Sequence, residues 1–217
     1  MEIEMKVPFG TDRVIDIINK VKNDPKYVED KFLKKVDSFY TNKTDAEASR
    51  NAAAKKGGVV VRIREEGDLP KNSVMHILLE NRQFPSLRKS ATFTTKIKTV
   101  VDGYESNVEN ETNIDNYQEM SKCLYNMGYR VWFNKVKYSY GVYTKVNGKT
   151  YHVEIERVMN EVNGRSVLYV EIENTQFERI PDSFNKESII ADEKSIFEDL
   201  GLLPGNSDNR PWVEILK

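Results

Sequence analysis

The chain opens with the stretch Met1-Glu2-Ile3-Glu4-Met5-Lys6-Val7, in which charged and apolar residues alternate. Because side chains of a β-strand point to its two faces in turn, Glu2, Glu4 and Lys6 would share one face of a strand here. The other face would be apolar. Taken alone, this pattern is typical of a strand with one face in water.

The same alternation recurs along the chain with the charges sorted by sign. The later segments contain Arg62 and Arg64, Lys96 and Lys98, Glu109 and Glu111, Lys135 and Lys137, His152 with Glu154 and Glu156, and Glu171 and Glu173. An ordinary exposed sheet face mixes Thr, Ser, Gln, Lys and Glu. The sorting therefore favours a cavity in which acidic residues hold divalent cations against a polyphosphate.

Length and composition limit the class of protein. The 217 residues are 39% hydrophobic with a formal net charge of −1, which favours one domain over residues 1–217 and no extended nucleic-acid partner. The single Cys123 excludes an internal disulfide, no apolar run approaches the roughly 20 residues that span a bilayer, and the charged opening does not resemble a signal peptide. We expect a cytoplasmic protein without a membrane partner, either a monomer or a homodimer.

The remaining elements follow from periodicity and turn residues. Apolar residues at helical spacing predict a helix from about residue 14, and further helices are expected at about 114–127 and 186–200. Strands are expected near 32–41, 91–100, 103–112, 129–144, 149–159 and 166–174, with hairpin turns at Asp102-Gly103, Asn147-Gly148 and Asn163-Gly164. Residues 42–58 are expected to form a loop and 66–90 an insertion with one extra strand, and the C-terminal segment of about 183–217 is expected to be helical.

About eight strands with charged faces cannot all turn those faces outward and still bury the helices. A closed, eight-stranded antiparallel β-barrel solves this problem, because its interior is wide enough for side chains or one small ligand. We therefore predict an α+β fold in which the charges line a tunnel and the helices pack outside.

The ordered motifs resemble the CYTH family, also called triphosphate tunnel metalloenzymes. Glu2, Glu4 and Lys6 match the family's opening Glu-x-Glu-x-Lys, and five later segments follow in the family's order. These segments are 37–40 (Asp-x-Tyr-Tyr), 62–64 (Arg-x-Arg), 95–96 (Thr-x-Lys), 135–137 (Lys-x-Arg) and 169–173 (Phe-x-Glu-x-Glu). Residues 211–216 are similar to the family's terminal Ser-Tyr-x-x-Leu-Leu. The chain departs from the pattern at Asn107, Lys137 and Glu156, which would alter how particular phosphates are bound.

The resemblance implies a set of roles for the charged residues. Glu2, Glu4, Glu156, Glu171 and Glu173 would hold Mg²⁺ or Mn²⁺, and Glu2, Glu4, Lys6 and Glu156 would be catalytic. The residues expected to bind phosphate are Lys6, Arg62, Arg64, Lys96, Lys98, Lys135 and Lys137. Glu109, Glu111, His152 and Glu154 would complete the tunnel wall. Zn²⁺ is less expected, because the chain has only two His and one Cys.

Two reactions fit such a site, with a small-molecule triphosphate or nucleotide as the partner. In hydrolysis, which we rank first, water attacks the terminal phosphorus of a nucleoside, thiamine or inorganic triphosphate. In the cyclisation of a class IV adenylyl cyclase, the ribose 3′-hydroxyl attacks the α-phosphorus and pyrophosphate leaves. Binding of a nucleotide or polyphosphate without catalysis is a third reading. A C-terminal helix across one end of the tunnel would favour hydrolysis, whereas an open end beside a base-sized apolar pocket would favour cyclisation.

Overall fold

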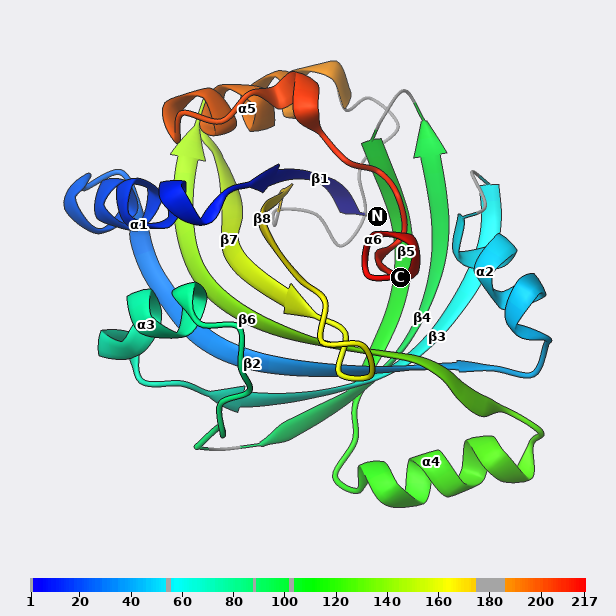
Figure 1. The fold of residues 1–217 in the computed structure, drawn as a ribbon. Coiled ribbons are helices and arrows are strands. Elements are labelled where there is room, and N and C mark those ends of the chain that lie inside the picture. Colours follow the sequence, from blue (N-terminus) through cyan, green and yellow to red (C-terminus); the bar gives the residue numbers. More distant parts are fainter. Residues whose placement is uncertain (1, 54–55, 88, 102–103, 175–185) are drawn as a thin grey trace.

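The computed structural model describes residues 2–53, 56–87, 89–101, 104–174 and 186–217. A curled antiparallel sheet, drawn in Figure 1, occupies the centre of the molecule. Its strands are β1 (Glu2–Phe9), β2 (Val28–Thr41), β3 (Lys56–Asp68), β4 (Ser90–Val101), β5 (Tyr104–Asn113), β6 (Arg130–Val146), β7 (Lys149–Met159) and β8 (Ser166–Asn174). The helices are α1 (Val14–Asn23), α2 (Asp45–Ala53), α3 (Val74–Leu79), α4 (Tyr117–Asn126), α5 (Lys186–Asp199) and α6 (Trp212–Ile215).

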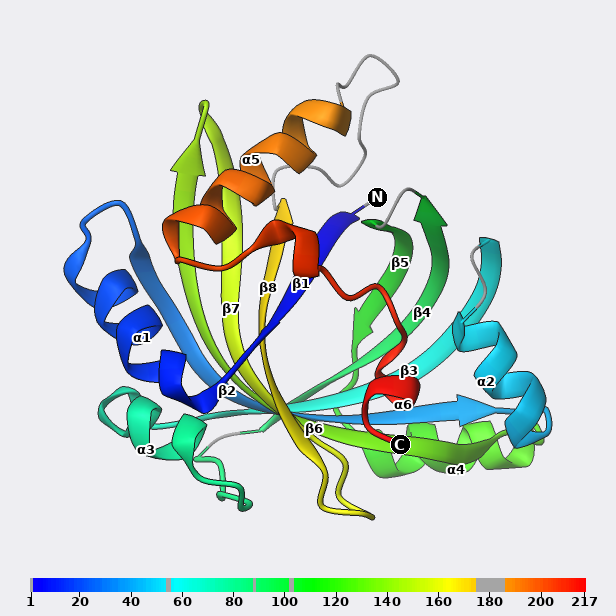
Figure 2. The ribbon, with the colours of Figure 1, turned by 45° about the horizontal axis from the view of Figure 1, so that its top comes forward.

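The strands follow the order β1-β5-β4-β3-β2-β6-β7-β8, and β8 pairs again with β1. The predicted α+β fold of eight antiparallel strands with helices outside is confirmed. The predicted closure of the barrel holds only in part: β1 joins β5 to β8, but the β1–β5 contact is short. β1 pairs with β5 only at Glu2, Ile3 and Glu4, and from Glu4 to Phe9 it follows β8 instead. Because one short strand is shared between two neighbours, the ring is joined at one end and the curled sheet is open along the rest of this seam (Figure 2).

The hydrophobic core lies outside the curled sheet, between the strands and the helices. Val14, Ile17, Ile18 and Val21 of α1 are buried at helical spacing, as predicted. They join apolar side chains of β1, β2, β6, β7 and β8 and of α3 and α5. A smaller cluster under α4 contains Tyr40, Ile63 and Leu124. Because the apolar faces of the strands serve these two cores, the charged faces point inward.

Two loop predictions are wrong. Residues 45–53 form α2, and Thr44 with Glu47 makes a capping box: the Thr44 amide donates to Glu47 Oε2 (3.0 Å) and the Glu47 amide to Thr44 Oγ1 (3.4 Å). In the 66–90 insertion, residues 74–79 form α3 rather than an extra strand, because Val74, Ile77 and Leu78 share one buried helical face.

The turn residues act largely as expected. Asn147 and Gly148 both have positive φ (50° and 78°), as a tight hairpin turn between β6 and β7 requires. Gly128, with φ 82°, ends α4, and Gly164 has φ 70° in the turn before β8. The predicted Asp102-Gly103 turn lies outside the described residues. So do positions 183–185, at the start of the expected C-terminal helical segment.

Candidate active site

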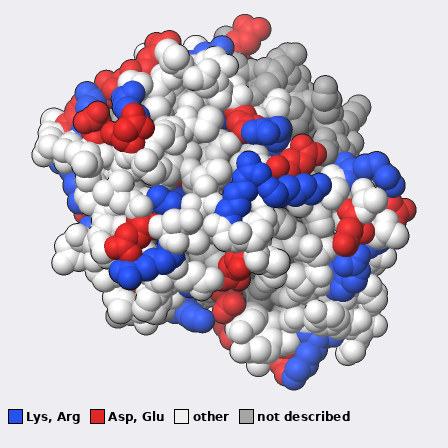
Figure 3. Space-filling view, in the orientation of Figure 1, with Lys and Arg blue, Asp and Glu red and all other residues white. Residues whose placement is uncertain are grey.

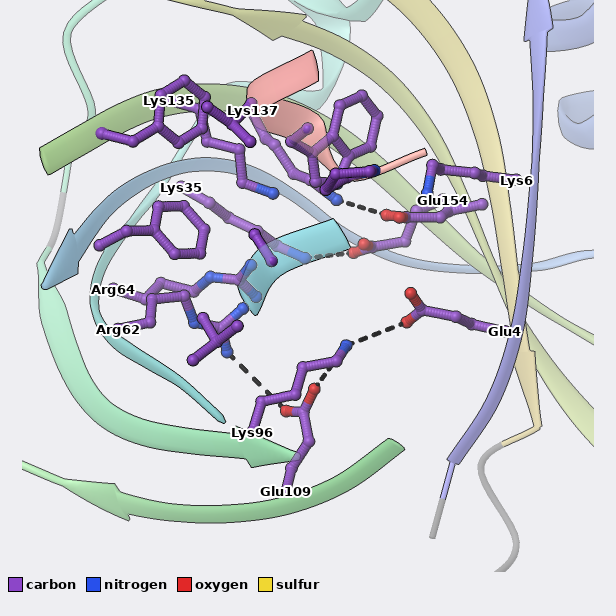
Figure 4. Close-up of a pocket in the computed structure, with 18 of the residues that line it drawn as sticks. Glu4, Lys6, Lys35, Arg62, Arg64, Lys96, Glu109, Lys135, Lys137 and Glu154 are labelled. Carbon is purple, nitrogen blue, oxygen red and sulfur yellow. Dashed lines mark hydrogen bonds and ion pairs between the residues drawn. The ribbon is translucent and has the colours of Figure 1, made fainter. Parts of the chain in front are cut away.

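The charged stripes line one cavity of about 320 Å³ inside the curled sheet (Figure 4). Its lining includes the predicted residues Glu4, Lys6, Arg62, Arg64, Lys96, Glu109, Glu111, Lys135, Lys137, His152, Glu154, Glu171 and Glu173. Glu156 is fully buried in the wall behind them. The side chains of Glu2 and Lys98 lie outside what the structure describes. The alternation in the sequence thus brings most of the predicted residues together.

One wall of the cavity is built around a buried carboxylate on β2. Asp37 is fully buried and accepts two hydrogen bonds from Arg64 of β3, from Nε (2.6 Å) and Nη2 (3.0 Å). Lys135 Nζ of β6 lies 3.4 Å from the same carboxylate. Although burial opposes it, the positive charges of Arg64 and Lys135 hold the pKa of Asp37 well below its usual value.

Lys135 is the residue of this wall that is least compensated electrostatically. It is 3% exposed, and burial together with the charge of Lys137 lowers its pKa well below the usual value, although Asp37 and Glu171 act in the opposite direction. An anion placed beside Lys135 would restore its charge.

The adjoining wall, beyond the Lys35–Lys137 pair of the β2–β6 ladder, holds three carboxylates. Glu154 and Glu156 of β7 and Glu171 of β8 each present an oxygen, and these oxygens lie within 4.8 Å of one another. Lys35 of β2 makes an ion pair with Glu154, and Lys137 makes ion pairs with both Glu156 (Nζ–Oε2, 2.8 Å) and Glu171. The sequence prediction included Glu156 and Glu171 as ligands and gave Glu154 only a place in the wall.

Glu156 differs from the other two acids of this group. Neither of its oxygens accepts a hydrogen bond from the described residues, and burial and the charge of Glu171 raise its pKa well above the usual value. For Glu171, burial is outweighed by Lys137, Lys135 and Lys6, which lower its pKa to about 2. Burial thus disfavours the charged form of Glu156 and the surrounding lysines favour the charged form of Glu171, and because the two acids interact they titrate as a pair.

A third set of charges lies nearer the opening. Lys96 of β4 is 2.8 Å from Glu109 and 3.5 Å from Glu4, and Arg62 is 3.3 Å from Glu111. Glu4 and Glu173, both predicted metal ligands, are cross-strand partners in the β1–β8 ladder rather than members of the three-carboxylate group.

His152 occupies the acidic side of the cavity. Its Nδ1 lies 3.3 Å from Glu173 and its Nε2 lies 3.3 Å from Asp30. Burial opposes protonation, but the hydrogen bond with Glu173 and the charge of Glu154 raise the pKa of His152. Its surroundings are those of a hydrogen-bonded wall residue.

Sequence reasoning gave no role to several residues of the site. Lys35 and Asp37 had a visible signal, because they alternate on β2 with the same period as the other charged stripes. Phe39, Trp132 and Phe133 line an aromatic part of the cavity, and Trp212 enters from α6. Glu193 of α5 had no signal: it is fully buried, and burial and the charges of Glu4, Glu173 and Asp192 raise its pKa well above the usual value.

Charges on the face of the molecule drawn in Figure 3 are not sorted by sign as they are in the cavity. On the face drawn in Figure 3, basic and acidic side chains lie in small mixed groups rather than in one broad basic area. No helix in the described part of the chain has the length and apolar character needed to cross a bilayer.

Comparisons with known proteins identify the fold. No family model and no curated protein matches the sequence. A protein of Pyrococcus horikoshii, PH1819, superposes with a TM-score of 0.67 at 15% identity, over 99% of this chain and 97% of its own. A "putative adenylate cyclase" from Vibrio parahaemolyticus gives a TM-score of 0.56 at 14% identity, over 99% and 96% of the two chains.

A third structure is a "putative adenylyl cyclase" from Hippeastrum, described as having a dominant triphosphatase activity. It gives a TM-score of 0.53 at 15% identity, over 93% of this chain and 89% of its own. At these identities the likeness is one of fold. The fold expected from the motifs is therefore confirmed, because the chain shares it with two proteins described as putative adenylyl cyclases.

Proposed function

We propose that the protein is a divalent-metal-dependent enzyme that hydrolyses the terminal phosphate of a triphosphate bound in the cavity. The observation that supports this most is that two unlike clusters meet there. Glu154, Glu156 and Glu171 form a buried acidic group, and cations from five strands surround the remaining space. A polyanion that bridges a metal ion and a set of ammonium and guanidinium groups satisfies both clusters at once.

The acidic group suits a hard divalent cation. Its three oxygens are close enough for one ion, and Mg²⁺ and Mn²⁺ prefer carboxylate oxygen. The buried oxygens of Glu156 accept no hydrogen bond from the described residues, and the ammonium of Lys137 lies 2.8 Å from Oε2, so Glu156 is suited to bind a cation. In the structure, Lys137 supplies the positive charge between Glu156 and Glu171. Glu2, Glu4 and Glu173 stay predicted ligands on the neighbouring strands.

The basic residues would bind the phosphates. Arg62 and Arg64 offer planar guanidinium groups for bidentate contacts, and the lysines act as point charges. The predicted contacts are Lys6, Arg62, Arg64, Lys96, Lys98, Lys135 and Lys137. A bound Mg²⁺ or Mn²⁺ would supply charge neutralisation and polarise the attacking water. Glu156 and Glu171 would hold the metal ion, and Lys137, which pairs with both, would then be available to a phosphate.

The C-terminal segment favours hydrolysis over cyclisation. Pro211, Trp212 and Val213 line the cavity, as expected for a segment that covers one side of it. Cyclisation of ATP to cyclic AMP is the second candidate, because Phe39, Trp132 and Phe133 offer an aromatic surface for a base. The descriptions of the Vibrio and Hippeastrum structures agree with either reaction.

The test is a panel of inorganic, nucleoside and thiamine triphosphates with Mg²⁺ or Mn²⁺, with the products separated. We expect orthophosphate from the parent and no turnover from Glu171→Gln, which removes a charge with little change in shape. Glu119→Gln, at an exposed site on α4, is the control. Pyrophosphate with a cyclic nucleotide would identify the cyclase instead. Tight binding of every triphosphate without any product would identify a non-catalytic binder.

A further inference from the structure

The C-terminal segment crosses the cavity and is fixed at both ends. At its start, the amide of Asp208 donates to the carbonyl oxygen of Lys6 on β1 (2.9 Å). At its end, the carbonyl oxygen of Leu216 accepts from the side-chain amides of Asn160 (3.2 Å) and Asn163 (2.9 Å). These anchors belong to β1 and to the β7–β8 turn region, so the segment between them has a defined position.

Trp212, between these anchors, lies against three buried lysines. The ammonium nitrogens of Lys6, Lys135 and Lys137 are 5.3, 4.8 and 5.1 Å from its ring centroid. The indole is oriented by an edge contact with Tyr169 (centroids 5.0 Å apart, planes at 78°). The Tyr169 hydroxyl in turn donates to Asp208 (2.7 Å), so the ring and the anchor of the segment are coupled.

The three lysines do not come from one stretch of sheet. Lys6 is on β1 and the other two are on β6, and β8 and β7 separate these strands in the sheet. All three are 5% exposed or less, and their like charges repel one another. An aromatic face attracts ammonium groups without neutralising them, and each ammonium has three N–H donors. The indole can therefore hold the three lysines near one another without accepting any of their N–H donors.

We propose that Trp212 is a positioning residue of the phosphate site, whose indole face holds Lys6, Lys135 and Lys137 in the arrangement that receives the substrate phosphates. The inference rests on the proposed function, because it assigns these lysines to a bound triphosphate. It adds that the C-terminal segment is part of the binding site. The sequence offered no such role, since an aromatic residue in a short terminal segment is ordinarily a packing residue.

The test compares two substitutions by calorimetry with inorganic tripolyphosphate. Trp212→Leu keeps an apolar side chain but removes the aromatic face, and we expect it to weaken binding by about tenfold. Trp212→Phe keeps an aromatic face and should stay within about threefold of the parent. In turnover assays the loss should fall on KM, with kcat changed much less, because the contact serves binding. Glu214→Gln, exposed on the same short helix, is the control.

The outcomes separate this inference from the proposed function. A parent that does not bind tripolyphosphate overturns the proposed function, and the inference with it. A parent that binds, with Trp212→Leu binding equally or more tightly, overturns the inference alone, because the indole would then be neutral or a competitor of phosphate. Equal losses in folded Leu and Phe variants also overturn it.

A spectroscopic measurement needs no change at position 212 and holds even if Trp212→Leu does not fold. The chain has two tryptophans, so in a Trp132→Phe background all tryptophan emission comes from Trp212. Tripolyphosphate should change the intensity or wavelength of this emission with the dissociation constant that calorimetry gives for the same Trp132→Phe variant. Saturation by tripolyphosphate with unchanged emission would contradict the contact.

Discussion

The two walls of the cavity compensate their buried charges differently. In the basic wall, the Arg64 guanidinium and Lys135 share Asp37, a fully buried carboxylate bonded to Arg64 through two hydrogen bonds. In the acidic wall, three carboxylates share two lysines, and Glu156 has no hydrogen bond to its oxygens from the described residues. The basic wall is thus assembled by the protein itself, whereas the acidic wall is short of positive charge.

The difference indicates that the basic wall would bind phosphates and the acidic wall would bind a metal ion. A preformed basic wall positions phosphates without reorganisation, which is the condition for electrostatic stabilisation of developing charge. An acidic wall with three carboxylates and two lysines gains stability when a further cation binds. Substitutions in the first wall should therefore cost folding stability, and substitutions in the second should change the response to metal.

The largest effect is expected for Asp37→Asn. Removing one partner of a buried ion pair leaves Arg64 and Lys135 uncompensated, and such changes cost about 3–5 kcal/mol of unfolding free energy. Denaturant unfolding at neutral pH measures it. Asp45→Asn, which breaks the exposed pair with Arg130, is the control and should cost about 1 kcal/mol or less. Equal losses of unfolding free energy in the two variants would show that the buried Asp37 pair contributes no more to stability than the exposed Asp45–Arg130 pair.

The Asp37 effect should also depend on pH. The pKa of Asp37 is lowered in the folded state, so the unfolded state binds its proton more readily. The stabilisation is fully present above the unfolded pKa and is lost as the pH falls through the folded pKa. The difference between parent and Asp37→Asn should therefore shrink in strong acid, as measured by unfolding at several pH values.

The second effect is stabilisation by metal. A ligand at about 100 times its dissociation constant adds about 2.7 kcal/mol to the unfolding free energy. We expect this gain for the parent with Mg²⁺ or Mn²⁺ and little gain for Glu156→Gln. Thermal unfolding with and without the metal ion measures both. Glu187→Gln, exposed on α5, should respond like the parent. A full gain in Glu156→Gln would exclude Glu156 from the metal site.

The contrast between the walls was only partly predictable from sequence. Alternation alone placed Arg64, Lys135 and Glu171 on the inward face, because the side-chain period of a strand is fixed at two. The membership of the acidic group depends on geometry across strands. Glu154 is the direct partner of Glu171 in the β7–β8 ladder, and the sequence does not specify that register.

Segments outside the sheet were harder to predict. Trp212 lines the cavity, and Glu193 of α5 is buried where the charges of Glu4 and Glu173 raise its pKa. Both positions depend on the packing of the C-terminal segment and α5, which no local pattern encodes. The helix at 45–53 did have a signal, the Thr44–Glu47 capping box, but its Ala- and Lys-rich composition was interpreted as a loop. In α3, one short apolar patch fits a strand or a helix equally well, and burial against α1 decides between them.

The third effect concerns Glu193 of α5, a buried carboxylate that is not part of the cavity lining. Both of its carboxylate oxygens are buried without a hydrogen-bond partner among the described residues. Glu193→Gln removes a buried ionisable group, and we expect a gain on the order of 1 kcal/mol near pH 8. Because the folded-state pKa is raised, the parent loses stability as the pH rises from the unfolded pKa toward the folded one, and the variant lacks this slope. Glu198→Gln, exposed on the same helix, should keep the parent's slope in pH-dependent unfolding.

The smallest effect is expected at the rim, where neither wall excludes water. The Glu111 side chain is 47% exposed, and it accepts hydrogen bonds from Thr94 (2.9 Å) and Arg62 (3.3 Å). Its substitution by Gln keeps an acceptor for both donors, and exposed ion pairs contribute only about 0.2–1 kcal/mol. The loss should shrink further at high salt, because exposed charges are screened and the buried Asp37 pair is not. Unfolding of Glu111→Gln and Asp37→Asn at low and high salt measures both properties. A loss of stability at Glu111 that equals the loss at Asp37 and is insensitive to salt would contradict this expectation. Arg62 and Glu111 would then have to be counted as part of the buried basic wall.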